Sequence, residues 1–68
     1  MIDMQTLTQD HIGKWVIYND GFREPEKGRI KSWNERFIFV VYERPGRDMN
    51  LFEHYTAVAT NPEDLEWL

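Results

Sequence analysis

Cysteine is absent from this chain of 68 residues, and histidine occurs only at His11 and His54. Without cysteine the protein has no disulfide, no Cys-based zinc site and no thiol chemistry. The two histidines lie far apart in the sequence without a clustered partner, so neither a metal site nor a bound cofactor is expected. The domain therefore depends on side-chain packing alone, which leaves a chain of this size little margin of stability.

Long apolar runs and a basic leader segment are missing as well. No stretch approaches the ~20 apolar residues that span a bilayer, and no positively charged segment precedes a shorter apolar one. We therefore expect a soluble, unprocessed protein without a membrane role. The lack of cysteine fits a reducing cytoplasm.

Residues arranged for catalysis are also lacking. Ser32 is the only serine, it lies within an expected strand, and no neighbouring histidine and acid accompany it. The four glycines are scattered over turns and strand starts and form no phosphate-binding loop. The 12 acidic residues are what a small, soluble, acidic domain needs for solvation. We therefore expect a protein that is not an enzyme.

An excess of positive charge is missing too, because the formal net charge is −4. Proteins that bind nucleic acid without sequence preference normally carry a basic excess, so the overall charge disfavours that class. The charge is uneven along the chain: residues 1–22 carry −2, residues 23–47 carry +3 and residues 48–68 carry −5. The middle of the chain is therefore mildly basic and its end is acidic.

Aromatic residues are plentiful, at 15% of the chain, and hydrophobic residues make up 41%. This composition is typical of a folded domain rather than a disordered one. Each aromatic side chain can bury about 150–250 Å². We expect these rings to take the place of the missing cross-links.

Short apolar segments separated by turn residues predict an all-β domain. The expected strands are residues 13–18, 27–33 and 37–42, a fourth of unclear phase somewhere within 49–59, and a short closing strand at Leu65–Trp67. Four to five antiparallel strands are too few for an immunoglobulin-type sandwich, so a small, strongly bent barrel is expected. One domain spans residues 1–68, with residues 1–11 as a lead-in segment.

Turn and capping residues stand between these segments. The sequence Asn19-Asp20-Gly21 tolerates positive φ, and Asn34-Glu35 predicts a tight reversal. Pro45-Gly46 predicts a type II turn. Thr8 is a candidate cap for a single turn that ends at His11.

The segment before the closing strand predicts one turn of helix. Thr60 or Asn61 can cap it, and Pro62 suits the first helical position. Glu63 and Asp64 favour the positive N-terminal end of such a turn.

FIFVVY, residues 37–42, presents apolar side chains to both faces of a strand. Ile38, Val40 and Tyr42 share one face, which we expect to fill the barrel. The other face carries Phe37, Phe39 and Val41. We expect it to be covered by lead-in and C-terminal residues, namely Ile2, Met4, Leu7, Leu65, Trp67 and Leu68. The alternative is an exposed patch of Phe39 and Val41 that serves self-association or a partner.

The segments IGKWVIY, GRIKSWN, FIFVVY and TAVATNPEDLEW, in this order, resemble those of SH3-like (KOW-like) barrels with a long first loop and a final PEDL turn. They are also similar to small, mostly uncharacterised proteins of phage and prophage genomes. The resemblance covers roughly residues 12–67. It implies an SH3-like barrel and a phage-type accessory protein in the cytoplasm of the bacterial host, and it implies almost nothing about activity.

The first functional hypothesis is a non-enzymatic binding module, of phage or prophage origin, that acts by protein–protein interaction with a host factor. Phe22 in a polar loop, Tyr18 and Trp33 could serve as anchors, since Trp, Tyr and Arg dominate interface energies. The chain would be a monomer or a weak homodimer.

The alternative hypothesis is a nucleic-acid-binding KOW/Tudor-like barrel. Lys27, Arg29 and Lys31 would project from one strand. Trp33 would lie beside them and Arg23 in the preceding loop, so that a base could stack and a phosphate could be held. The same residues also have a purely structural interpretation. The charged side chains would then form a solvated strand face that discourages pairing with another strand, and Trp33 would belong to the core. The candidate partner-binding residues under both hypotheses are Phe22, Arg23, Arg29, Lys31, Trp33 and Phe39.

Overall fold

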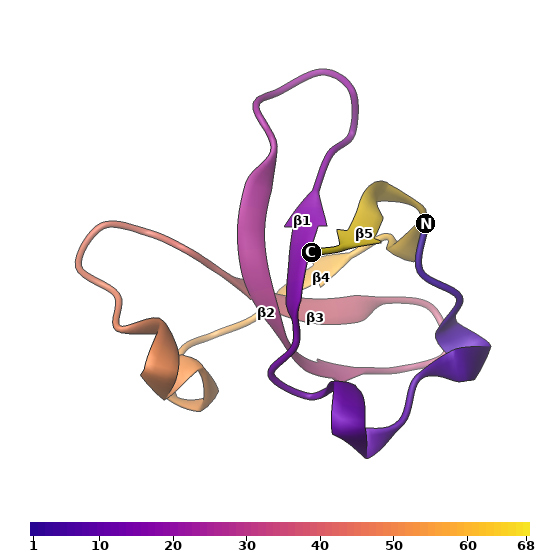
Figure 1. Ribbon diagram of the computed structural model, residues 1–68, viewed down its shortest axis with the longest axis horizontal. Coiled ribbons are helices and arrows are strands. Elements are labelled where there is room, and N and C mark those ends of the chain that lie inside the picture. Colours follow the sequence, from indigo (N-terminus) through magenta and orange to yellow (C-terminus); the bar gives the residue numbers. More distant parts are fainter.

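A computed structural model describes residues 1–68 and shows an all-β domain built on one five-stranded antiparallel sheet (Figure 1). The strands are β1 (Trp15–Tyr18), β2 (Glu26–Trp33), β3 (Ile38–Tyr42), β4 (Val58–Thr60) and β5 (Leu65–Trp67). Four 3-10 helices accompany them: η1 (Met4–Thr6), η2 (Gln9–His11), η3 (Met49–His54) and η4 (Pro62–Asp64). None of these helices has the length and apolar character needed to cross a membrane. The predicted all-β class and the helical turn before the last strand are confirmed.

The strand order is β4-β3-β2-β1-β5, and every neighbouring pair is antiparallel. No ladder joins β4 to β5, so the sheet is open and these two strands are its edges. The prediction of a closed barrel is wrong in this respect. Each edge strand has only three residues, and the η4 turn between them carries the chain across to β1, with which β5 pairs.

The inner face of the sheet holds the main core. Seven buried residues form it: Ile2, Val16, Ile30, Ile38, Val40, Tyr42 and Leu65. As predicted, alternate residues of β3 point into this core. The lead-in segment closes over it, because the Ile2 N–H donates to the Pro62 carbonyl at 3.0 Å and Met4 and Leu7 pack at the margin.

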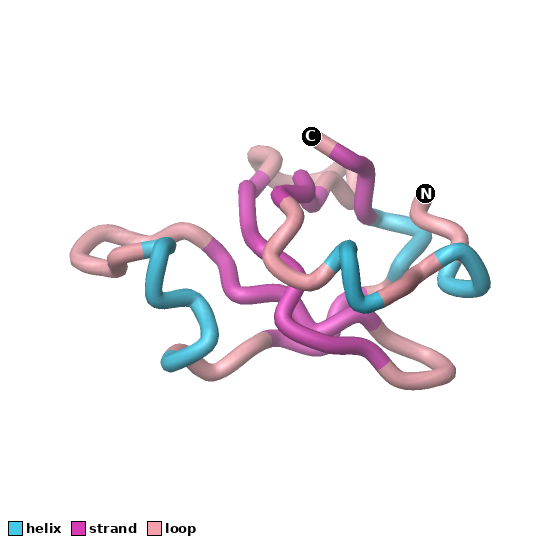
Figure 2. The backbone as a smooth tube through the Cα atoms, turned by 60° about the horizontal axis from the view of Figure 1, so that its bottom comes forward, coloured by secondary structure: helices cyan, strands magenta, loops and turns pink.

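The η3 segment covers the part of the outer face of β3 around Val41. Val41 is fully buried there against Met49 and Phe52. The prediction that the lead-in and C-terminal residues cover this face is therefore wrong, because the lead-in packs on the inner face instead. Figure 2 shows η3 on the opposite side of the molecule from η1 and η2. On the same β3 strand Phe39 is half-buried, and Phe37 just before it is exposed.

The predicted fourth strand within residues 49–59 is wrong for most of its length. Residues 49–54 form η3, which begins after Asp48, whose side chain accepts a hydrogen bond from the Asn50 N–H at 3.0 Å. The segment kinks at Leu51, whose φ of −104° and ψ of 29° are not helical, and Met49 and Phe52 on either side of the kink are both buried against Val41. Only residues from Val58 onward join the sheet.

The predicted turns are confirmed. Gly21 and Gly46 have φ of 83° and 84°, and the Arg47 N–H donates to the Arg44 carbonyl at 3.1 Å across the Pro45-Gly46 turn. Asn61 caps η4 by accepting from the Glu63 N–H at 3.0 Å, with Pro62 at the first helical position. Local side-chain chemistry is sufficient to place each of these turns.

Candidate functional site

The guanidinium of Arg29 lies between two main-chain segments. Its Nε donates to the Gly13 carbonyl at 2.7 Å, and its Nη1 donates to the Met49 carbonyl at 3.0 Å. It also lies over the rings of Phe52, at 4.5 Å, and Trp15, at 5.6 Å. Arg29 therefore ties η3 to the segment that precedes β1.

Lys31 and Trp33 do not complete a basic face around Arg29. The Lys31 Nζ donates to the Tyr55 carbonyl at 2.8 Å, at the end of η3. A register shift between Ile30 and Ser32 marks a β-bulge, and a shift of one residue moves the following side chains to the other face. Trp33 accordingly packs at the margin of the main core.

Phe22 and Arg23 lie in the loop of residues 19–25, which extends from the sheet between β1 and β2 (Figure 1). Phe22 is 93% exposed. Two side chains fix the loop: Asp20 Oδ1 accepts from the N–H groups of Phe22 and Arg23 at 2.9 and 3.2 Å, and Asn19 Oδ1 accepts from the Gly21 N–H at 3.0 Å. The loop thus presents an exposed ring from a backbone held by local hydrogen bonds.

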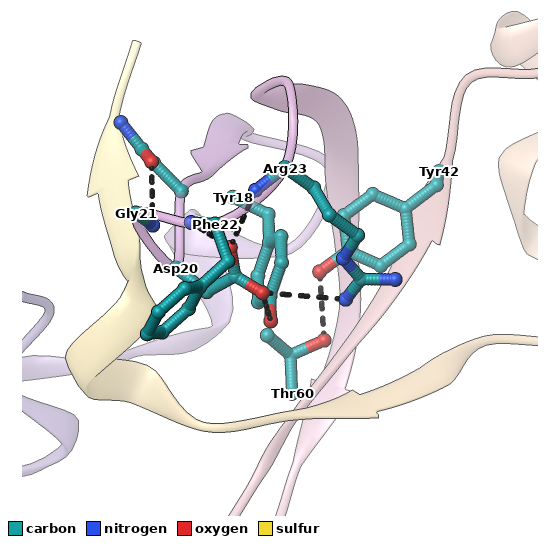
Figure 3. Close-up of polar contacts among 8 residues, drawn as sticks. Tyr18, Asp20, Gly21, Phe22, Arg23, Tyr42 and Thr60 are labelled. Atoms are coloured by element: carbon teal, nitrogen blue, oxygen red, sulfur yellow. Dashed lines mark hydrogen bonds and ion pairs between the residues drawn. The ribbon is translucent and has the colours of Figure 1, made fainter.

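Asp20 also joins the loop to β1, as Figure 3 shows. Its Oδ2 accepts from Tyr18 Oη at 3.1 Å and from Arg23 Nη2 at 3.4 Å. Hydrogen bonds to the carboxylate, that of the Phe22 N–H first, lower the pKa of Asp20. Desolvation, followed by the hydrogen bond to Asp20, raises the pKa of Tyr18. At neutral pH the carboxylate is therefore ionised and the Tyr18 hydroxyl remains a donor.

An open cleft of about 370 Å³ lies beside this loop, and its walls come from β1–β4 and η4. This volume falls within the range of about 300–1,000 Å³ that is common for ligand sites. The cleft is lined by Tyr18, Arg23, Glu26, Tyr42, Arg44, Val58, Ala59, Thr60, Asn61 and Asp64.

Two tyrosines form the aromatic part of the cleft. Tyr18 and Tyr42 meet edge to face with their ring centroids 6.1 Å apart. The Tyr42 hydroxyl is hydrogen-bonded to Thr60 Oγ1 at 2.8 Å, a buried contact that links β3 to β4 (Figure 3). Burial raises the pKa of Tyr42, so its hydroxyl also stays neutral.

The unbalanced charge in the cleft is negative. Both arginines already have partners: Arg23 pairs with Asp20 at 3.4 Å, and Arg44 Nη1 pairs with Glu26 Oε1 at 3.1 Å. Asp64 lines the same cleft and takes part in no ion pair. The cleft therefore offers one carboxylate to a positively charged group.

The structure brings only Phe22 and Arg23, of the six predicted partner-binding residues, to the loop beside this cleft. Phe39 lies on the outer face of the sheet, opposite Ala59. No local pattern in the sequence predicts most of the cleft, because its walls come from segments far apart in the chain, such as those of Tyr42 and Thr60. The turn residues after Tyr18 were the one local signal of a fixed loop.

Comparison with protein-family models, curated proteins and solved structures finds no match to this chain. The resemblance to SH3-like barrels and to phage proteins therefore stays a prediction. No group of three or more His, Cys, Asp or Glu side chains gathers where it could hold a metal ion. The function is accordingly inferred from the geometry and charge of the loop and its cleft.

Proposed function

We propose that the protein is a non-enzymatic binding module that acts by protein–protein interaction, with the loop of residues 19–25 and the adjoining cleft as its contact surface. The partner, as the resemblance to phage proteins implies, is a host protein in the bacterial cytoplasm. The observation that carries the proposal is Phe22, 93% exposed on a hydrogen-bonded loop whose next residue, Arg23, lines the cleft.

The residue types at this surface are those that contribute most to interfaces. Aromatic and arginine side chains dominate binding energies, and the cleft and its loop hold Phe22, Tyr18, Tyr42 and two arginines. Burying an exposed phenylalanine side chain is worth about 1.5–3 kcal/mol. Because Asn19 and Asp20 already hold the loop, a partner gains this energy with little entropic cost for ordering the backbone.

The nucleic-acid alternative has less support in the contacts. Arg29 and Lys31 each donate to main-chain carbonyls, so a phosphate would have to share these cations with the hydrogen bonds that hold η3. Trp33 lies at the margin of the main core, apart from both cations. In the experiment that follows, binding of nucleic acid is therefore the result that would contradict the protein-binding proposal.

The experiment is an affinity capture from bacterial lysate, with and without nuclease treatment, that uses the full chain and its variants. We expect the wild type to retain a protein partner in stoichiometric amount, and Phe22→Ala to retain at least tenfold less because its anchor is removed. Phe37→Ala, which removes another exposed ring, should retain as much as the wild type.

Two results would contradict the proposal. One is the absence of any retained protein. The other is retention of RNA or DNA, lost on nuclease treatment and in the double variant Arg29→Glu with Lys31→Glu, while Phe22→Ala binds normally. Circular dichroism of each variant is the control for folding.

A further inference from the structure

The cleft runs along the free edge of β4. Val58, Ala59 and Thr60, three consecutive residues of one strand, all line it. Successive side chains of a strand point to opposite faces, so three in a row cannot reach a cleft that lies on one face. The cleft therefore faces the edge of the strand, where the main chain itself is accessible.

The hydrogen-bonding pattern identifies which main-chain groups face that edge. The Asn34 N–H donates to the Phe37 carbonyl, and the Glu43 N–H donates to the Lys27 carbonyl, across the β2–β3 ladder. Since peptide groups alternate in direction along a strand, Phe39 also points toward β2. The N–H and C=O groups of its neighbours Ile38 and Val40 therefore point toward β4.

This alternation fixes the direction of Ala59. Ile38 pairs with Thr60, and Val40 pairs with Val58, so these are the hydrogen-bonded pairs of the β3–β4 ladder. Ala59 lies opposite Phe39 in a non-hydrogen-bonded pair. Its N–H and C=O therefore point away from β3, and no hydrogen bond outside the sheet uses them.

The β4 edge is short, at three residues, but it lacks the other features that usually block strand addition. Residues 56–60, Thr-Ala-Val-Ala-Thr, contain no charge and no proline, and Val58 is 54% exposed. Natural sheets protect their edges with lysine, proline or bulges. The opposite edge, β5, carries Glu66, which is paired with the N-terminal ammonium group. Of the two edges of this sheet, β4 is thus the one to which a further strand could more readily pair.

The charge of the cleft indicates what kind of segment would occupy this edge. Asp64 is the carboxylate without an ion-pair partner, so a segment that brings a lysine or arginine is favoured. A second copy of this chain would not bring one on its own β4, because residues 48–68 contain no Lys or Arg.

We propose that the cleft binds an extended segment of a partner protein as an added strand on β4, hydrogen-bonded to the N–H and C=O of Ala59. A lysine or arginine of that segment lies beside Asp64. Strand addition of this kind takes its affinity from main-chain hydrogen bonds and its specificity from alternate side chains. The inference rests on the proposed protein-binding function and names the partner's conformation and charge.

The test begins with a pool of random nonapeptides displayed on phage and selected against the full chain. A selected peptide is then synthesised, and its Kd is measured by fluorescence anisotropy. Ala59→Pro removes the edge donor while the ladder bonds at Val58 and Thr60 remain, and proline suits an edge strand. Ala59→Ser keeps the donor and is the matched control.

We expect the selected peptides to carry a lysine or arginine. Ala59→Pro should weaken binding at least about tenfold, because a peptide carbonyl is left without a partner, whereas Ala59→Ser should change it less than about twofold. Asp64→Asn should weaken binding about threefold to tenfold. On wild-type protein, methylating the peptide's backbone nitrogens at one set of alternate positions should abolish binding, and methylating the other set should not.

Several results would overturn the inference: no peptide selected, equal binding by Ala59→Pro, or no difference between the two methylated sets. A concentration-dependent dimer of the chain alone that Ala59→Pro disrupts would assign the edge to a second copy instead. If Ala59→Pro captures the same lysate protein as the wild type and Phe22→Ala does not, this inference fails and the proposed function stands. If no lysate protein is captured at all, the proposed function itself fails.

Discussion

Replacing Arg29 with alanine separates a structural role from a ligand-binding role for this residue. The wild-type side chain makes two charge-assisted hydrogen bonds to carbonyls, those of Gly13 and Met49, each worth about 1.5–3 kcal/mol. Its contacts with the Phe52 and Trp15 rings add about 0.5–1 kcal/mol each. Arg29 is half-buried, so water replaces part of these interactions in the variant. We expect a net loss of about 2–4 kcal/mol in the free energy of unfolding.

A loss of this size is large for a domain of 68 residues, whose whole stability is about 3–10 kcal/mol. Urea unfolding followed by far-UV circular dichroism measures it. With a slope of about 1 kcal/mol/M, the midpoint should fall by about 2 M or more. Arg36→Ala, at an exposed position, is the control and should change stability by less than about 0.5 kcal/mol. An Arg29→Ala variant as stable as the wild type would refute the structural role and restore Arg29 as a candidate phosphate ligand.

Three further predictions concern the sheet and its tyrosines. Gly28→Ala should lower the free energy of unfolding by about 1–3 kcal/mol, because the added Cβ would lie 2.5 Å from Val40 Cγ1; an unchanged urea midpoint would show that β2 and β3 are not so closely packed. Thr60→Val leaves the buried Tyr42 hydroxyl without its partner and should cost about 1–3 kcal/mol, whereas the same substitution in a Tyr42→Phe background should cost clearly less. The pKa values of Tyr18 and Tyr42 are raised above 10.0, so the stability that the two groups contribute is fully present below about pH 10 and is lost as pH rises through the folded-state pKa values. The urea midpoint should therefore stay constant from pH 7 to 9 and fall above pH 10, and it should fall less steeply in Tyr42→Phe than in the wild type. Equal slopes for the two proteins would contradict this.

Local signals in the sequence predicted the parts of the fold that depend on local chemistry. The turn at Asn19-Asp20-Gly21 and the cap at Asn61 form through side chains that bond to the main chain within three residues. The strands at 13–18, 27–33 and 37–42 follow from apolar patterning and agree with the structure to within one residue, apart from β1, which starts two residues later than predicted.

The parts that were wrong depend on contacts between distant residues. Met49 and Phe52, on either side of the kink at Leu51, are buried against Val41, which lies on another strand. The β-bulge after Ile30 turns Trp33 toward the core, and an alternating pattern gives no sign of the extra residue. The outer face of β3 was expected to lie under the lead-in, which instead fills the open side of the inner core.

The candidate site was predicted only in part for the same reason. Phe22 and Arg23 stand out in the sequence as an aromatic and a cation in a polar loop. The cleft beside them depends on the hydrogen bond between Tyr42 and Thr60 and on the position of Asp64 in η4. These contacts join residues from distant segments, so no short stretch of sequence predicts them. Arg29 and Lys31 have the residue types of a nucleic-acid site, yet their cations are used to hold η3.

Titration of the ¹⁵N-labelled chain with the captured partner, followed by NMR, tests the position of the binding surface most directly. We expect the largest amide shifts at Phe22, Arg23 and Ala59, with the Ala59 amide slowed in hydrogen exchange on binding. Shifts confined to the outer face around Arg29, Lys31 and η3, with the cleft unchanged, would contradict the account.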